Sequence, residues 1–277
     1  MKQVSSVITL VALLMFVNQN LQAQGKWYYN ASFQTVGSSF DDGSTHNSFF
    51  LFNGITYQSS VVYLNVNIPM VASSFNTFTQ IENTFVPNNR MGGHNNEWFN
   101  TQNHMFSSDG TITDAPSFGL GDMYINGSIQ VIDEHHFLPS LSFDGYVKIP
   151  TASENLGIGT GYFDYHIALG ARKYNGNFIF YAQLGYLLIG KNSGSGLTDP
   201  VTFSAGIGYT LTNKRHSFFL GYDSYSTIIQ GTASPKQLGF GYNYLVRNGL
   251  FFTTIISAGL NSSTSDYTAA LGFNLEI

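Results

Sequence analysis

Ionisable residues are sparse in this sequence, and a group of them falls in three alternating segments between residues 119 and 173. In each segment apolar and polar side chains alternate, so the polar ones share one face of a strand. The candidate residues on these polar faces are Asp122, Tyr124, Asp144, Tyr146, Lys148, Asp164, His166 and Arg172. If neighbouring segments pair as hairpins, Asp122 lies opposite Lys148, about 5 Å away, and Lys148 lies near Asp164. The spacing predicts a row of opposite charges across one wall.

This row of charges has two interpretations. It can fix the register between neighbouring strands, or it can contact a solute that moves along the polar face, and we favour the first. A partly hydrated charge pair contributes only about 0–1 kcal/mol, so register and selectivity are its expected roles. We therefore expect the substitution Lys148→Leu to change ion selectivity or folding yield.

His166 and Arg172, which share the face of Asp164, could together with Asp144 also be interpreted as an Asp/His catalytic set. Hydrolysis needs a nucleophile within hydrogen-bond reach of its base, and neither a G-x-S-x-G motif nor a Ser locally spaced to a His is present. The adjacent pair His135-His136 points to opposite faces of the chain, which disfavours a metal site. The glycine run 156–161 lacks the Lys-Ser/Thr and the helix of a phosphate loop. We expect no enzyme, no metal and no cofactor, and keep a barrel hydrolase as the least favoured alternative.

The elements that must position these residues are long strands. Period-two alternation recurs about twelve times along the chain, in the segments 27–34, 49–57, 62–70, 119–132, 138–149, 162–173, 178–188, 201–211, 218–222, 238–246, 250–260 and 266–277. Many of these segments are longer than the five or six residues usual in soluble proteins and long enough to cross a bilayer at a tilt. The alternation blurs near Ser224, where a bulge is expected.

The composition favours a membrane barrel over a soluble domain. Charged residues make up only 10% of the chain and aromatic residues 16%, whereas soluble domains carry about 25% charged residues. The net charge of −5 argues against a nucleic-acid partner, which requires a basic surface. Cysteine is absent from the sequence, which excludes disulfides and thiolate metal sites.

The N-terminus carries the features of an export signal. Lys2 precedes an apolar stretch, 7–17, and small residues follow, which predicts a signal peptide over 1–23 with cleavage before Gln24. Export, alternating strands and the lack of a helix-length apolar run together predict an antiparallel β-barrel of about twelve strands over 24–277, in the bacterial outer membrane. Its expected partners are outer-membrane lipid and lipopolysaccharide, the barrel assembly machinery and a small-molecule solute.

The segment 72–117 interrupts the alternation and is unusually long for a connection. It is rich in Asn, Gly, Ser and Thr, yet it holds six large aromatic residues: Phe75, Phe78, Phe85, Trp98, Phe99 and Phe106. The segment is interpreted either as a long extracellular loop or as a loop folded into the lumen, where these side chains would pack. Two further strands hidden in it would make the barrel fourteen-stranded.

Three fragments of the central region resemble a known outer-membrane family. They are GLGD at 119–122, KIPT at 148–151 and LGIGTGYFD at 156–164. Together with the strand layout of 118–277, they resemble the family named for the MetA pathway of phenol degradation, a distant relative of FadL-type barrels for hydrophobic compounds. Ala152 stands where members of that family usually have Gly, and the early first strand leaves little room for the N-terminal plug of FadL-type barrels.

The resemblance implies a transporter-like barrel. On that basis we expect a channel for small hydrophobic or aromatic compounds in the outer membrane. A structural or surface-interaction barrel with a closed lumen is the alternative. The two hypotheses differ in what they expect of 72–117, which gates the lumen in the first and forms an outward-facing surface in the second.

Overall fold

The computed structural model describes residues 25–39, 45–73, 78–81, 84–87, 117–152, 160–191 and 195–277. These residues form β-strands, and among them no helix is long and apolar enough to cross a membrane. The strands are β1 Lys26–Ser39, β2 Thr45–Gln58, β3 Val62–Ser73, β4 Phe78–Ile81, β5 Thr84–Pro87, β6 Ser117–Leu120, β7 Met123–Ile132, β8 Ser140–Ile149, β9 Asp164–Asn175, β10 Phe178–Leu188, β11 Val201–Thr210, β12 His216–Tyr225, β13 Lys236–Arg247, β14 Leu250–Gly259 and β15 Tyr267–Glu276.

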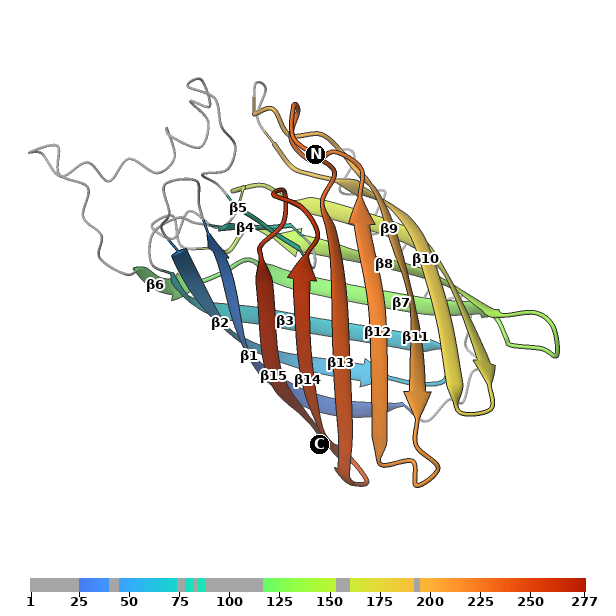
Figure 1. Cartoon of the computed structure of the whole chain (residues 1–277). Coiled ribbons are helices and arrows are strands. Elements are labelled where there is room, and N and C mark those ends of the chain that lie inside the picture. The colour runs from blue at the N-terminus through green and yellow to red at the C-terminus, as the bar shows by residue number, and fades with distance from the viewer. Residues whose placement is uncertain are drawn as a thin grey trace, which may run out of the picture.

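Twelve of these strands close into an antiparallel barrel (Figure 1). Each of β7 to β14 pairs with the next strand, β15 pairs with β1, and β2 and β3 complete the ring back to β7. Closure removes the free edges of the sheet, so all wall strands find hydrogen-bond partners in a medium that offers none. The predicted twelve-strand barrel is confirmed. The two strands hidden in 72–117, β4 and β5, pair with each other in a separate sheet rather than in the wall.

The predicted strand over 119–132 is interrupted at Gly121 and Asp122. Here β6 pairs with one end of β3, Leu120 opposite Met70, and β7 pairs with the other, Tyr124 opposite Asn67. The interruption faces Pro69, which has no N–H to give to the ladder and whose carbonyl oxygen accepts from Gly121 N at 2.8 Å. A Cβ on Gly121 would lie 2.7 Å from the Pro69 ring, so a larger residue does not fit there.

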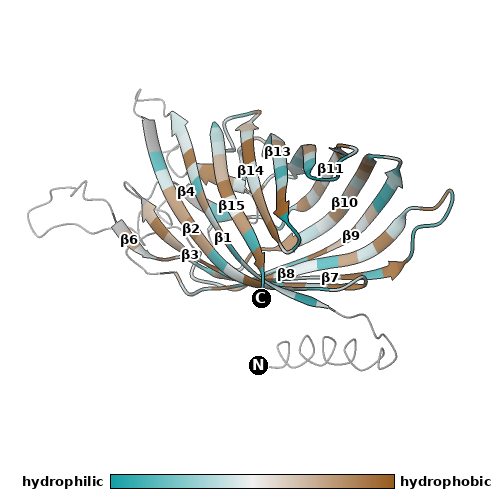
Figure 2. Ribbon diagram, turned by 90° about the horizontal axis from the view of Figure 1, so that it is seen from below, coloured by the Kyte–Doolittle hydropathy of each residue, from teal (hydrophilic) through white to brown (hydrophobic). Residues whose placement is uncertain are grey.

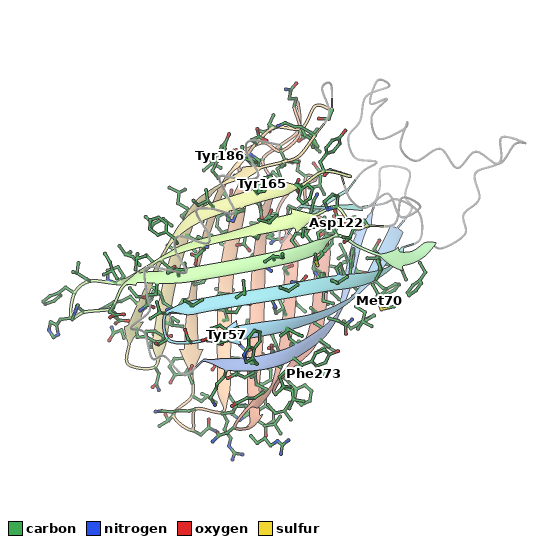
Figure 3. The ribbon with its side chains drawn as sticks, turned by 180° about the vertical axis from the view of Figure 1, so that it is seen from behind. Tyr57, Met70, Asp122, Tyr165, Tyr186 and Phe273 are labelled. Carbon is green, nitrogen blue, oxygen red and sulfur yellow. The ribbon has the colours of Figure 1, made fainter. Side chains whose placement is uncertain are left out.

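Hydrophobic and hydrophilic residues alternate along the strands (Figure 2). The apolar ones form the outer surface, and the interior is more polar. On β9 the outward Ile167 and Leu169 are 62% and 48% exposed, whereas the inward Asp164 and His166 are buried. Outward aromatic residues flank this apolar band, with Tyr57 and Phe273 toward one end and Tyr165 and Tyr186 toward the other (Figure 3). Such a band with aromatic girdles is typical of a surface that faces lipid.

The connections differ between the two ends of the barrel. Those at one end are short and cover 59–61, 133–139, 176–177, 211–215 and 248–249. Those at the other end are longer on the whole and cover 40–44, the segment between β3 and β6, 150–163, 189–200, 226–235 and 260–266. In bacterial outer-membrane barrels the short turns lie on the periplasmic side and the longer loops outside, so we assign the short turns to the periplasmic end.

The bulge predicted near Ser224 is wrong. Ser224 pairs with Phe203 on one side and with Lys236 on the other in unbroken ladders. The alternation blurs in the sequence because Tyr222 and Tyr225 are amphipathic and suit either face, not because the register shifts. Irregularities of the ladder lie instead between Gln130 and Ile132 in β7 and between Leu245 and Arg247 in β13.

Candidate functional site

The barrel interior contains a cavity of about 1060 Å³. Most of the side chains along it are small or polar, and they come from inward positions on all the wall strands; among them are Asn30, Gly54, Asn126, Ser142, Gln183, Ser204, Gly239, Asn243, Ser257 and Asn274. The charged residues that the structure describes on this lining are Asp144, Arg172 and Asp223. The cavity reaches the short turn at Ser59 and Ser60, so it extends to the periplasmic end of the barrel.

The β4–β5 hairpin contributes to the lining of the cavity on the side of the long connections. Gln80 and Phe85 of the hairpin line the cavity. Phe85 is only 2% exposed and packs on the inward side of the wall, where its ring centroid lies 4.9 Å from that of Phe50. Its carbonyl oxygen accepts a hydrogen bond from Ser265 N at 2.8 Å, which ties the hairpin to the β14–β15 connection. The hairpin therefore lies within the barrel rather than on its outer surface.

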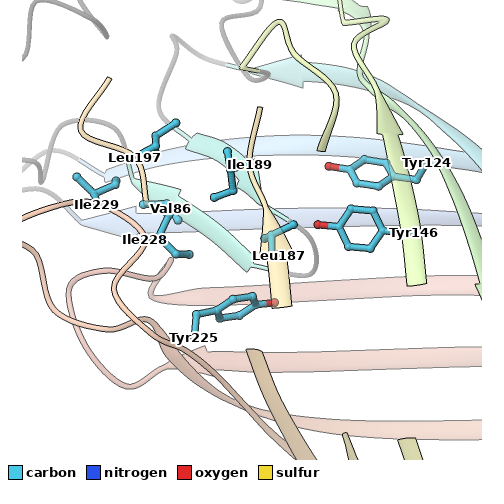
Figure 4. Packing of buried hydrophobic residues seen from close by; sticks show 9 residues of the cluster. All are labelled: Val86, Tyr124, Tyr146, Leu187, Ile189, Leu197, Tyr225, Ile228 and Ile229. Carbon is cyan, nitrogen blue, oxygen red and sulfur yellow. The ribbon is translucent and has the colours of Figure 1, made fainter. Parts of the chain in front are cut away.

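A second group of apolar side chains fills the interior beside the hairpin. The group, which we call the apolar layer, is drawn in Figure 4 and consists of Val86, Tyr124, Tyr146, Leu187, Ile189, Leu197, Tyr225, Ile228 and Ile229. Val86 comes from the hairpin, the tyrosines and Leu187 come from wall strands, and the others come from two long connections. Tyr124 and Tyr146 also line the cavity. The interior thus changes from apolar to polar along the barrel.

The predicted row of charges exists, and it is fully buried. Lys148 is 0% exposed, and its Nζ forms ion pairs at 2.7 Å with Asp164 Oδ2 and at 3.5 Å with Asp122 Oδ2. The same Nζ donates to Thr160 Oγ1 at 2.9 Å. The expectation of a partly hydrated pair is wrong. Thr160, Ala152 and Gly190, at the ends of the β8–β9 and β10–β11 connections, cover these groups.

The register of the row also differs from the prediction in one respect. Lys148 is directly opposite Asp164, as expected, but on the other side it is opposite Tyr124 rather than Asp122. Asp122 instead precedes β7, at the interruption beside Pro69, and reaches Lys148 from there. Asp122, Lys148 and Asp164 form one ion cluster, which joins the interruption between β6 and β7 to the regular strands β8 and β9.

The two carboxylates also bind the long connections. Asp122 Oδ1 accepts from Ala152 N at 2.9 Å, and Asp164 Oδ1 accepts from Gly190 N at 2.9 Å. These contacts fix the start of the β8–β9 connection and the start of the β10–β11 connection. Asp122 and Asp164 each bind both Lys148 and a backbone N–H of a long connection. This arrangement supports the interpretation in which the charges hold the structure together.

His166 belongs to an aromatic row on the wall. The Tyr146 ring lies between the rings of Tyr124 and His166, with centroids 5.7 and 5.3 Å away. His166 Nε2 lies 2.9 Å from Thr202 Oγ1 on the wall. Among the residues that the structure describes, no group of three His, Asp or Glu side chains is placed to hold a metal ion.

Asp144 and Arg172 both face the cavity, but they bind different partners. Asp144 accepts from the Oγ of Ser128 and Ser142 and from Gln183 Nε2. Arg172 Nη2 donates to Gln130 Oε1 at 3.1 Å, and its guanidinium lies 5.8 Å from the centroid of the Tyr174 ring. Their polar positions were predicted, whereas the partners that they find on other strands, Ser128, Gln183 and Gln130, were not.

The sequence did not single out Asp223, which is the other carboxylate on the cavity. It accepts from Ser204 Oγ at 2.6 Å and from Gln237 Nε2 at 3.2 Å. Strict alternation from Phe219 would have placed it inward, but the blurred pattern near Ser224 hid that signal. Of the predicted loop aromatics, Phe85 packs inside, Phe78 begins β4, and Phe75, Trp98, Phe99 and Phe106 lie outside the described residues.

Comparison with known proteins agrees with this architecture. A family model described as "Putative MetA-pathway of phenol degradation" matches residues 59–277. No curated protein sequence was found to match the chain.

Two solved structures share the fold. The COG4313 outer membrane channel from Pseudomonas putida F1 aligns with a TM-score of 0.56 and 12% identity, over 91% of this chain and 94% of that one. The NanC porin aligns with a TM-score of 0.51 and 7% identity, over 91% of this chain and 100% of that one. At these identities the likeness concerns the fold, and it confirms the predicted outer-membrane β-barrel.

Proposed function

Because the chain belongs to the family of the MetA pathway of phenol degradation, we propose that it is an outer-membrane channel for small hydrophobic or aromatic compounds. The observation that carries this proposal is the interior itself, where a closed barrel holds a cavity of about 1060 Å³ beneath an apolar layer rich in tyrosine. The similarity of its fold to a solved outer membrane channel supports it.

In this proposal the β4–β5 hairpin is the constriction of the channel. A solute that enters from outside meets Phe85 and the apolar layer first, where burial of apolar surface contributes about 25 cal/mol per Å². Tyr124 and Tyr146 pack against each other at the boundary with the cavity, where an aromatic ring of the solute can join them. The cavity below is lined by polar groups and leads to the periplasmic turns, so the solute passes from an apolar to a hydrated environment.

The candidate path residues take different roles in this proposal. Asp144 and Arg172 set the charge of the cavity, and Tyr124, Tyr146 and His166 form the aromatic row at its boundary. The ion cluster of Asp122, Lys148 and Asp164 holds the surrounding connections and does not contact the solute.

A structural or surface-interaction barrel is the second candidate, and one observation favours it. The hairpin and the apolar layer fill the end of the lumen nearest the long connections. If this filling is permanent, the lumen is closed and no solute passes.

The test is solute entry into liposomes that contain residues 24–277. The wild type is compared with a variant in which a Gly/Ser segment of equal length replaces the hairpin, residues 78–87. We expect selective entry of small aromatic solutes over sugars and ions, with faster and less selective entry after the replacement. A matched control replaces residues 230–233 of a long connection, which lie outside the apolar layer, in the same way. Absence of entry through every variant would contradict the channel and favour the surface-interaction barrel.

A further inference from the structure

The turn between β7 and β8, residues 133–139, differs from the other short turns that the structure describes. Those consist mainly of polar residues and glycine, such as Ser59-Ser60 and Asn175-Gly176, and their apolar residues, Val61 and Leu211, are only partly exposed. At the tip of the β7–β8 turn, Phe137 is 88% exposed and Leu138 is 61% exposed. Exposure of large apolar side chains to water is unfavourable, so this tip is expected to have an apolar partner.

The turn is held firmly by the neighbouring strand. Lys173 Nζ on β9 contacts three carbonyl oxygens of the turn at 2.7, 3.1 and 3.3 Å, those of His135, His136 and Leu138. The same ammonium pairs with Glu134 Oε1 at 3.0 Å, and Glu134 accepts from Tyr174 N. His135 N donates to the carbonyl oxygen of Leu138 and closes the turn. Phe137 is thus presented by an ordered turn.

The turn lies on the lipid-facing side of the wall. Lys173 occupies the same face of β9 as Ile167 and Leu169, which belong to the apolar band, and it is opposite Phe180 on β10. Because Lys173 reaches the turn from that face, the turn lies toward the outer side of the wall, at the ends of the strands. In Figure 1 it projects beyond the wall at that end. Val131 and Ile132, which precede the turn, are half exposed and continue the apolar band toward it.

A hollow of about 620 Å³ separates the turn from the β9–β10 hairpin. Its lining combines an aromatic surface, Phe180, with polar groups that can donate hydrogen bonds, those of His135, His136 and Asn175, and with the ion pair of Lys173 and Glu134. A phospholipid has the matching chemistry, with a phosphate-bearing headgroup next to an acyl chain. A solute in transit does not fit this place, since the hollow is outside the barrel.

We propose that the turn 133–139 anchors the barrel in the interfacial region of the periplasmic leaflet and seats a phospholipid there. The headgroup lies against the polar side of the hollow, and the acyl chain lies along Phe180 and Phe137. The argument is the continuity of the exposed apolar tip with the lipid-facing band. It does not depend on whether the lumen conducts solutes.

The chain contains no cysteine, so a single introduced thiol can be labelled cleanly. A spin label is placed by Phe137→Cys in the barrel reconstituted in phospholipid vesicles. Controls are Leu169→Cys in the apolar band and Thr212→Cys in the exposed β11–β12 turn. We expect the label at position 137 to be more accessible to oxygen than to a water-soluble nickel complex, as at position 169. Strong accessibility to nickel, as at position 212, would overturn the anchor and favour a periplasmic protein as the partner.

The seat is tested with a second variant and a second measurement. The triple substitution His135→Ala, His136→Ala, Phe137→Ser removes the polar and apolar contacts but leaves Lys173 and the backbone of the turn. Native mass spectrometry of barrels extracted from phosphatidylglycerol or phosphatidylethanolamine vesicles counts the phospholipids that stay bound. We expect the wild type and Thr212→Cys to retain a phospholipid that the triple variant loses. Equal retention by all three proteins would overturn the proposed seat.

Discussion

At the scale of single residues, Lys148 lies at the centre of the buried ion cluster on the inner face of the wall. Its ammonium is removed from water and surrounded by two carboxylates and one hydroxyl oxygen. Transfer of such charges out of water is strongly unfavourable, and their mutual attraction compensates only while every partner is present. The cluster therefore contributes less to stability as a whole than the removal of a single member would suggest. Its main consequence is that two long connections are fixed relative to the wall.

The first prediction concerns the loss of one member of this cluster. The substitution Lys148→Met leaves Asp122 and Asp164 as unpaired buried carboxylates, and we expect it to lower the free energy of unfolding by about 3–5 kcal/mol. Urea unfolding of the barrel in vesicles measures the change. Substitution of all three residues, with Asn at positions 122 and 164, should restore much of the loss.

An exposed ion pair provides the matched control. Lys26 pairs with Glu276 Oε1 at 2.8 Å, but its side chain is 56% exposed. We expect Lys26→Met to change the free energy of unfolding far less than Lys148→Met, because water screens the exposed pair. A loss as small for Lys148→Met would contradict the role that we assign to burial.

At the scale of elements, the closeness of neighbouring strands varies from place to place along the wall. Gly127 on β7 and Gly145 on β8 are directly opposed and occupy the same outward face. A Cβ on Gly145 would lie 2.5 Å from the carbonyl oxygen of His166, whereas one on Gly127 would have its nearest neighbour, Tyr63 O, at 4.0 Å. A methyl group would therefore clash at position 145 but find open space at position 127, although the two glycines are directly opposed.

The second prediction follows from this pair of glycines. We expect Gly145→Ala to lower the free energy of unfolding by about 1–3 kcal/mol, because β8 and β9 must move apart to admit the methyl group. Gly127→Ala should be close to neutral. The two urea unfolding midpoints are compared, and equal midpoints would show that the wall adapts to the methyl group without loss.

The third prediction concerns the pH dependence of the β7–β8 turn. The side-chain hydrogen bond from Lys173 holds the pKa of Glu134 below its usual value, against a smaller effect of partial burial, and the Tyr174 N–H acts in the same direction as Lys173. Since the folded-state pKa is lowered, the contact stabilises the turn at pH values above the unfolded pKa of about 4.3. The stabilisation is lost as the pH falls through the still lower folded-state pKa.

A spin label at Phe137→Cys reports this change as mobility. We expect no change between pH 7 and pH 5 and increased mobility below about pH 4. When Glu134→Gln is added to the Phe137→Cys variant, the label should give the mobile spectrum over the whole pH range. A label at Thr212→Cys should respond little to the change in pH. A spectrum at position 137 that stays constant down to pH 2 would show that the carboxylate does not hold the turn.

At the scale of the whole molecule, the barrel separates three environments. The outside is an apolar band, the end near the long connections is filled by the hairpin and the apolar layer, and the remainder of the lumen is polar. Among the described residues, two carboxylates, Asp144 and Asp223, face this polar part against one guanidinium, Arg172. Charges that face a narrow low-dielectric passage act on all ions within it.

The fourth prediction is that the lumen prefers cations. In planar bilayers under a salt gradient, the reversal potential of the wild type should have the sign of cation selectivity. The double substitution Asp144→Asn, Asp223→Asn should move it toward zero or reverse it, and Asp133→Asn in the exposed turn should not. An unchanged reversal potential in the double variant would show that these carboxylates do not face the conducting path.

The sequence alone determined the strands and their two faces. Alternation with period two is local, since each residue's face follows from that of its neighbours, and the turns carry their own signals. For this reason the wall, the outward position of Leu169 and the inward positions of Lys148 and Asp164 were all predictable. The pairing of Lys148 with Asp164 was predictable as well, because the two residues lie on successive strands that pair as a hairpin.

The tertiary structure decided the features that depend on distant parts of the chain. The interruption opposite Pro69 moved Asp122 out of the predicted register, and the long connections buried Lys148, which alternation alone would leave in a wet lumen. The hairpin of residues 78–87 has no alternation long enough to reveal its place, and its packing on Phe50 becomes visible only when the barrel closes around it. Local pattern therefore set the wall, and contacts between distant segments set what fills it.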